Sequence, residues 1–216
     1  MRPALKLGLA TLAYSGLHSA LASRTAKRLA AFAFGERFQR AFYRPFFIAH
    51  AALSTTALLL YARRLPTRTI YHIRGPAAWV LRAGQIAALA HAYAAAHEVG
   101  LARISGLEGV GAWARGEEIP AGPAAQGPER DPTSGALTTA GPFLWSRHPL
   151  NFSPVPLFWL APHLTTRRLA FNLVGTLYLV LGSVHEELRL REAYGAQYAA
   201  YQRSGVPFFF PRVGTW

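Results

Sequence analysis

The sequence contains no cysteine and few acidic residues. Of 216 residues, 15% are charged, and Lys and Arg outnumber Asp and Glu by 23 to 10; a typical soluble domain has about 25% charged residues. The absence of cysteine excludes a disulfide scaffold and any cysteine-ligated metal site. Because 51% of the residues are hydrophobic, the chain can offset the entropy of ordering, which excludes a disordered protein. A basic, aromatic-rich chain with so little charge favours a compact membrane protein.

Charged residues are missing from long stretches of the chain. Four runs lack them entirely and a fifth contains only Arg82, and each run is close to the roughly 20 residues that an α-helix needs to cross a bilayer. The runs cover residues 7–23, 45–62, 77–97, 149–166 and 169–185. They predict an all-α integral membrane bundle of about five transmembrane helices, the first of them retained and not cleaved as a signal peptide.

The fourth run contains four prolines, at 149, 154, 156 and 162. Proline removes a backbone donor and disrupts a helix interior. We therefore expect this helix to be kinked or broken, with its freed backbone groups satisfied by the protein or by water.

Basic residues are unevenly distributed between the two sides of such a bundle. Fourteen Lys and Arg residues fall on the side of the 24–44 and 102–148 loops and of the tail, and eight fall opposite. The positive-inside rule then places the C-terminus in the cytoplasm, as expected for a multi-pass protein of a prokaryotic inner membrane. This basic face would attract anionic lipid headgroups, and its dispersion around the spans argues against nucleic acid as a partner.

The chain is expected to form one membrane domain, 1–216, with three parts. Residues 1–104 supply three helices, residues 105–140 form a cytoplasmic loop rich in Gly and Pro, and residues 141–216 supply a helical pair and a C-terminal helix. The sequence does not indicate an oligomeric state.

Two polar clusters mark the last part. Arg147, His148 and Pro149 stand at the mouth of the fourth helix, and Glu186 and Glu187 follow the fifth. Consecutive helices joined by a short turn return to the same side, so these side chains could converge. Apolar and aromatic residues then recur at intervals of four, four and three, at Leu190, Tyr194, Tyr198 and Tyr201. These spacings predict an amphipathic C-terminal helix that covers the cytoplasmic site with this face.

Together these positions resemble a known group of enzymes. The pattern is similar to that of the isoprenylcysteine carboxyl methyltransferase and phospholipid methyltransferase group. It consists of Arg-His-Pro, a hydrophobic helical pair, and then Glu-Glu-x-x-Leu-x-x-x-aromatic-Gly-x-x-Tyr-x-x-Tyr with a closing Pro211. His18-Ser19, Arg44 and His97-Glu98 resemble its NnrU and methanethiol S-methyltransferase-like branch. Where the family often has an aromatic residue two places after His-Pro, this chain has Asn151.

The resemblance implies transfer of a methyl group from S-adenosylmethionine to a small or lipid-like acceptor, with a thiol or a carboxylate favoured. Arg and His suit the carboxylate of this cofactor, Glu suits its amino group, and aromatic faces suit its sulfonium and adenine. The expected cofactor-binding residues are Arg147, His148, Glu187, Tyr194, Tyr198 and Tyr201. A thiol acceptor would need a base, for which His148 and Glu186 are the candidates, and Trp145 and Asn151 are expected to line the acceptor tunnel. No metal is expected.

Other interpretations stay open. Arg147 could extend to the membrane interface, the two glutamates could begin a solvated helix, and the tyrosines could form an interfacial aromatic belt. A haem or redox-linked protein would use pairs among His18, His50, His91 and His97, although His91 and His97 lie about 240° apart on a helix and cannot share one metal. A non-catalytic membrane scaffold or sensor is the third possibility.

Overall fold

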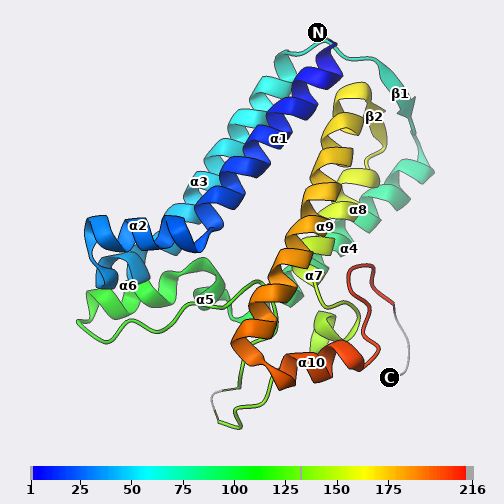
Figure 1. Cartoon of the computed structure of the whole chain (residues 1–216). Helices are drawn as coiled ribbons and strands as arrows, with labels where there is room; N and C mark the ends of the chain where they lie inside the picture. The colour runs from blue at the N-terminus through cyan, green and yellow to red at the C-terminus, as the bar shows by residue number, and fades with distance from the viewer. Residues whose placement is uncertain (1, 132, 213–216) are drawn as a thin grey trace. The chain divides into compact units, whose positions relative to one another are not determined.

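The computed structural model describes residues 2–131 and 133–212 and is built almost entirely from helices (Figure 1). By its internal contacts the chain divides into two compact units, each assembled from three stretches of sequence. The first unit comprises Met1–Thr69, Ala102–Gly122 and Thr165–Gly175; the second comprises Ile70–Leu101, Pro123–Leu164 and Thr176–Trp216. The expected all-α class is confirmed.

The first unit is built around a pair of long helices that lie side by side (Figure 1). Its helices are α1 (Pro3–Ala22), α2 (Arg24–Phe34), α3 (Glu36–Arg64) and α6 (Leu107–Ala114), the last preceded by α5 (Leu101–Ser105). Ser23 separates α1 from α2, and its hydroxyl accepts a hydrogen bond from the Ala26 amide at 3.1 Å, which caps α2. Thr55 donates to the Tyr14 hydroxyl at 2.9 Å and so joins α3 to α1.

Helix α6 packs closely on α3. A Cβ added to Gly109 would lie 3.3 Å from the Cα of Ala41, so the missing side chain is what allows the two backbones to approach. Ala41, Ala112 and Ile119 are buried together beside Phe42. This small apolar core joins two segments that are far apart in the sequence.

The second unit carries the residues of the predicted site. It contains α4 (Pro76–Val99), the short 3-10 helix η1 (Gly141–Leu144), α7 (Pro149–Phe152), α8 (Pro154–Trp159), most of α9 (Thr166–Tyr194) and α10 (Ala196–Arg203). Strands β1 (Thr69–His72) and β2 (His163–Thr165) pair as a small sheet. Helix α4 contacts η1, α7 and α8, so it supports the segment from residue 141 to residue 159.

The proline-rich fourth run is broken, as expected. It forms α7, of four residues, and α8, of six, and each begins at a proline, where the missing N–H has no helical partner to lose. The side chain of Gln85 on α4 donates to the Leu157 carbonyl at 2.8 Å. A protein side chain thus satisfies a carbonyl within the broken segment.

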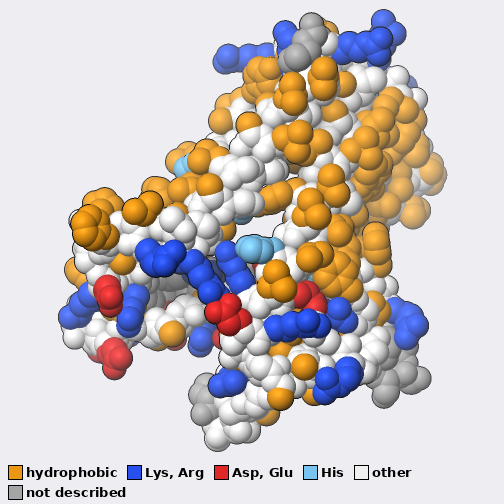
Figure 2. Space-filling view, in the orientation of Figure 1, with side chains coloured by type: hydrophobic (Ala, Val, Ile, Leu, Met, Phe, Trp, Pro, Cys, Tyr) orange, Lys and Arg blue, Asp and Glu red, His pale blue; other side chains and the backbone are white. Residues whose placement is uncertain are grey.

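Two helices are long and apolar enough to cross a membrane, α3 and α9. Their outward positions are hydrophobic: Leu53 is 72% exposed, and Leu173, Leu177 and Leu181 each expose more than half of their surface. Figure 2 shows mostly hydrophobic side chains over α4 and α8 of the second unit, with charged side chains gathered toward α10. The remaining spans of the five-helix scheme stay a prediction.

The amphipathic helix predicted from Leu190 onward is divided in two. Helix α9 continues to Tyr194, Gly195 breaks it with a φ of 52°, and α10 follows. The chain turns between α9 and α10 (Figure 1), through a backbone conformation that glycine adopts readily. Leu190, Tyr194, Tyr198 and Tyr201 nevertheless meet in one buried cluster with Val206, so the apolar face was predicted correctly and the single helix was not.

The segment rich in Gly and Pro contains no helix among its described residues between 116 and 140. Within the second unit it packs against the tail: Ala125 belongs to the buried cluster around Leu190, and a Cβ on Gly127 would lie 2.7 Å from a Leu190 methyl group. An irregular segment thus covers the end of α9.

Replacing Gly195 with Ala tests the break between α9 and α10. The positive φ disfavours any side chain, at a cost of about 1–3 kcal/mol, although no atom lies within 4 Å of the added Cβ. We expect a lower thermal unfolding midpoint in detergent. Gly182→Ala is the matched control, because its Cβ also meets nothing within 4 Å but its backbone is helical; it should leave the midpoint equal or higher. Equal midpoints for the two variants would contradict the assigned backbone conformation.

Candidate active site

The guanidinium of Arg147 connects three parts of the second unit. Its Nε donates to Glu187 Oε1 at 2.8 Å and its Nη1 donates to the Val206 carbonyl at 2.9 Å, while the Arg147 amide donates to the Pro207 carbonyl at 2.9 Å. The guanidinium also lies over the ring of Phe208, 5.7 Å from its centroid. Arg147 therefore binds α9 and the tail at once and does not extend to solvent.

His148 is fully buried and lies between two carboxylates. Its Nδ1 is 3.4 Å from Glu186 Oε2 and its Nε2 is 3.1 Å from Glu187 Oε1. An ionised carboxylate only accepts hydrogen bonds, so both contacts are satisfied when both ring nitrogens carry a proton. Burial opposes the charged ring, but the hydrogen bonds and charges of Glu186 and Glu187 outweigh it and raise the pKa of His148.

Glu187 lies beyond the apolar run that ends at residue 185 and is the centre of the cluster. Its Oε1 accepts from Arg147, from His148 and from the hydroxyl of Tyr198 at 3.0 Å, and its Oε2 accepts from the side-chain amide of Gln202. Burial disfavours the charge, but the hydrogen bonds from His148 and Arg147 and their positive charges lower the pKa of Glu187 to about 2. Three of these donors therefore share Oε1, whereas Oε2 accepts from Gln202.

Asn151 belongs to the same cluster. Its amide nitrogen donates to Glu186 Oε2 and to the Ser183 hydroxyl, both at 3.0 Å. The residue that departs from the family pattern thus holds Glu186 against α7. A phenyl ring could make neither bond, so the polar residue here is matched to its surroundings.

The hydroxyl groups of the three tyrosines have different hydrogen-bond partners. The Tyr198 hydroxyl contacts Glu187, the Tyr194 hydroxyl donates to Glu129 at 3.1 Å, and the Tyr201 hydroxyl donates to the Phe143 carbonyl. Burial, followed by the charge of Glu187, raises the pKa of Tyr198. Of the three, the structure brings only Tyr198 into contact with the charged cluster, whereas Tyr194 and Tyr201 bind the preceding loop and η1.

Several members of the cluster were not predicted. Gln202 bonds to Glu187 and accepts from Arg191 Nε at 2.7 Å, and Ser146 donates to the Phe209 carbonyl at 2.8 Å while accepting from the His148 amide. Ser146 stands next to Arg147, and its position inside the motif is a signal that sequence reasoning could have used. Gln202 has no such signal, because it reaches Glu187 only after the chain turns at Gly195.

The predicted tunnel residue Trp145 stacks on a histidine. Its ring lies 5.9 Å from that of His91 at an interplanar angle of 14°. Among residues 2–131 and 133–212, no three His, Asp or Glu side chains are grouped so that they could hold a metal ion.

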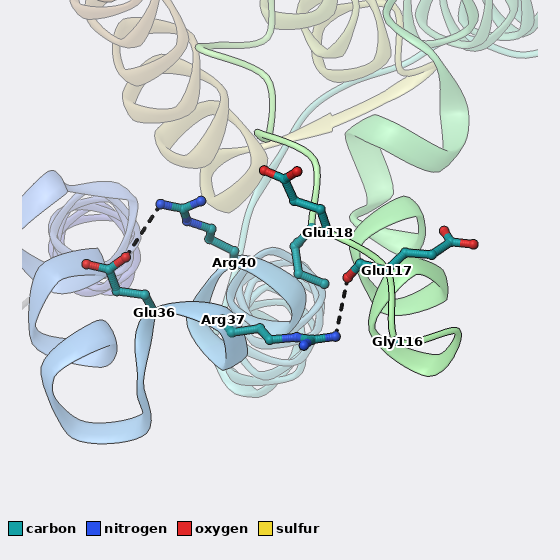
Figure 3. Close-up of a pocket in the computed structure, with 7 residues that line it drawn as sticks. Glu36, Arg37, Arg40, Gly116, Glu117 and Glu118 are labelled. Atoms are coloured by element: carbon teal, nitrogen blue, oxygen red, sulfur yellow. Dashed lines mark hydrogen bonds and ion pairs between the residues drawn. The ribbon is translucent and has the colours of Figure 1, made fainter.

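Two surface hollows accompany these features. In the second unit, a hollow of about 330 Å³ lies beside α10; it is lined by Leu137, Thr139, Leu144, Gln197, Ala200, Tyr201, Ser204 and Val206. In the first unit, a hollow of about 340 Å³ contains charges of both signs from the start of α3 and from residues 116–119 (Figure 3). There Arg40 pairs with Glu36 and Arg37 donates to the Glu117 carbonyl, and no predicted site residue lines it.

The second unit thus defines a class: a helical protein with a buried ionic cluster next to apolar helices. Comparisons with known proteins indicate which enzymes this class resembles. The chain is 33% identical over 73 residues to a methanethiol S-methyltransferase of Pseudomonas deceptionensis, which covers 34% of this chain and 28% of that protein. A methanethiol S-methyltransferase of Crocosphaera subtropica is 31% identical over 86 residues, 40% of this chain and 33% of the relative.

These relatives confirm the resemblance to the methanethiol S-methyltransferase branch of membrane methyltransferases. The chain matches about a third of the length of these curated relatives or less. No family model matches the chain, and no solved structure matches it.

Replacing Glu187 with Gln tests the charge state of His148. The amide keeps the shape of the carboxylate but not its charge. One of the two negative charges that stabilise the protonated ring against the effect of burial is then lost, so the pKa of His148 should fall. Histidine-selective ¹⁵N NMR titration in detergent measures this shift. Because the pKa is raised in the folded protein, the stability from protonated His148 is complete below its ordinary value of about 6.5 and is lost as the pH rises through the raised value.

The matched control is Glu192→Gln, whose side chain is exposed on the same helix. It should leave the His148 titration unchanged. A His148 pKa that is the same in Glu187→Gln as in the natural protein would show that the cluster does not stabilise an imidazolium.

Proposed function

We propose that this protein is an S-adenosylmethionine-dependent membrane methyltransferase that methylates a small thiol at a cytoplasmic site. The observation that carries the proposal is the convergence of Arg147, His148 and Glu187 in one buried cluster. Buried charges are costly unless they are paired, and a cluster of both signs suits a zwitterionic ligand. The names of the two relatives support methyl transfer to a thiol.

The cluster offers groups for both charged ends of the amino-acid part of the cofactor. Arg147 is a cation that would bind its carboxylate, and the buried His148 would add its positive charge to the site. Glu186 would bind its amino group, since both of the hydrogen bonds it accepts here fall on Oε2. Glu187 orients both cations. It would also bind the ammonium directly, if the ammonium replaces the side-chain amide of Gln202 as a hydrogen-bond donor to Glu187.

The hollow beside α10 fits the remaining part of the cofactor. Leu137, Leu144 and Val206 give it an apolar lining, and Tyr201 supplies an aromatic side chain, which suits an adenine ring. Val206 also joins the hollow to the cluster, because its carbonyl accepts from Arg147. Tyr194 supports this arrangement through Glu129 on the covering segment.

When bound, S-adenosylmethionine supplies an electrophilic methyl group on a positively charged sulfur. The chain's part is to hold donor and acceptor in line and to exclude water, which is the main source of rate in such a displacement. Trp145 and Asn151 flank the Arg-His-Pro segment and would line the path of the acceptor. A lipid-facing approach would suit a small apolar thiol.

We further propose that the chain is a multi-pass membrane protein with the cluster on the cytoplasmic side. Helices α3 and α9 meet the length and composition of a span, and α1 and α4 have 20 and 24 residues. The excess of Lys and Arg on one side of the predicted spans supports this orientation.

Titration calorimetry with S-adenosylhomocysteine tests cofactor binding in detergent. Arg147→Ala and Glu187→Ala should each weaken binding about tenfold or more, because a hydrogen bond to a charged group contributes about 1.5–3 kcal/mol and 1.4 kcal/mol is tenfold in affinity. Arg203→Ala on the exposed side of α10 is the control and should bind like the natural protein. Absence of binding by the natural protein, or equal binding by all variants, would refute the assignment.

The absence of cysteine makes the topology directly measurable. A single cysteine at Ser134 or at Thr67 would be the only thiol in the chain. In intact cells, a membrane-impermeant maleimide should label Thr67→Cys and not Ser134→Cys, and after lysis it should label both. The reverse pattern would place the cluster outside the cytoplasm.

A further inference from the structure

His91 on α4 is placed beside the Arg-His-Pro segment without belonging to the ionic cluster. Its ring stacks on Trp145 and meets Phe152 edge-on, with ring centroids 6.1 Å apart. Its Nδ1 lies 2.8 Å from the Ser153 hydroxyl. Residues 145–153 therefore present charged side chains to α9 and aromatic side chains to His91.

The hydrogen bonds of Ser153 assign the proton on this ring. The Ser153 hydroxyl has one proton and donates it to the Pro149 carbonyl at 2.7 Å. It must then accept from His91, which places the imidazole proton on Nδ1. Neutral His91 consequently carries its lone pair on Nε2.

The environment of Nε2 agrees with this tautomer. The atom is buried and has no hydrogen-bond partner among the described residues. A buried N–H without an acceptor is rarer in proteins than an under-satisfied acceptor, so an unprotonated Nε2 is the better match. The atom is a proton acceptor shielded from water, held in a fixed orientation by Ser153 and Trp145.

His148 offers no such lone pair, because both of its nitrogens face carboxylates. A thiol must lose its proton to become a strong nucleophile. The other candidate base, Glu186, is in the proposed function taken up by the amino group of the cofactor, so the reaction requires a base outside the ionic cluster. We propose that His91 is the general base that deprotonates the thiol acceptor, with Ser153 as its positioning residue. This inference rests on the proposed methyltransferase function.

The thiol proton moves to His91 Nε2 and forms an imidazolium that still donates to Ser153 through Nδ1. The thiolate lone pair forms a bond to the methyl carbon of the sulfonium donor, and the bond from that carbon to the donor sulfur breaks, leaving its electron pair on that sulfur. The products are a neutral thioether and a neutral donor sulfide, and the imidazolium passes its proton to water that enters as the products leave.

The first arm of the test needs no cofactor. In ¹⁵N-histidine NMR spectra of the ligand-free protein, the resonances that disappear in His91→Asn should show a protonated Nδ1 and an unprotonated Nε2. Ser153→Ala should shift His91 toward a mixture of tautomers. A protonated Nε2 on His91 in the natural protein would overturn the proposal.

The second arm compares two thiols of different acidity. Asn keeps an amide donor near the Nδ1 position but supplies no base, so His91→Asn should slow methylation of ethanethiol roughly 10²-fold or more. Methylation of 4-nitrothiophenol, which is ionised at neutral pH, should change little. His97→Asn, an exposed histidine on the same helix, is the control and should behave like the natural protein with both thiols.

The outcomes separate the two proposals. If the natural protein binds S-adenosylhomocysteine and methylates both thiols, but His91→Asn slows both equally or neither, the base assignment is wrong and the methyltransferase proposal stands. If the natural protein neither binds S-adenosylhomocysteine nor methylates either thiol, the proposed function fails and the base assignment fails with it.

Discussion

The second unit depends on the hydrogen bonds that the buried carboxylate of Glu187 accepts. It receives hydrogen bonds from Arg147 and His148 before α7, and from Tyr198 and Gln202 on α10. Each partner compensates part of the cost of burying a charge, and removal of one partner from a buried pair is strongly destabilising. The same contacts that hold the tail against α9 therefore also fix the positions of the charges available to a ligand.

The cluster forms where apolar segments end. The fourth run is divided by its prolines into two short helices, and Arg147 and His148, just before the first of them, contact α9. His148 precedes α7 with a non-helical backbone, so these two side chains do not follow the helical path. The short segment that begins the fourth run thus presents charged side chains to α9 and aromatic side chains to His91.

Two histidines beside this segment show how environment sets chemical role. His148 lies between two carboxylates, which favour the doubly protonated ring. His91 has a serine hydroxyl on one nitrogen and no partner among the described residues on the other, which favours a neutral ring with a lone pair. The same residue type is thus a cation at His148 and a proton acceptor at His91, as the proposed chemistry requires.

The sequence by itself determined the helical class, the apolar runs, the break in the fourth run and the membership of the charged cluster. These follow from local properties: charge-free length, the missing N–H of proline and the fixed order of Arg147, His148, Glu186 and Glu187. Only the tertiary structure decided that Gly195 ends α9, that Gln202 completes the shell of Glu187, that Tyr194 and Tyr201 bind neighbouring segments, and that His91 faces Ser153. Those features depend on where the chain turns and on which acceptor receives each hydroxyl proton. A residue pattern encodes neither, because both are set by contacts in the folded chain.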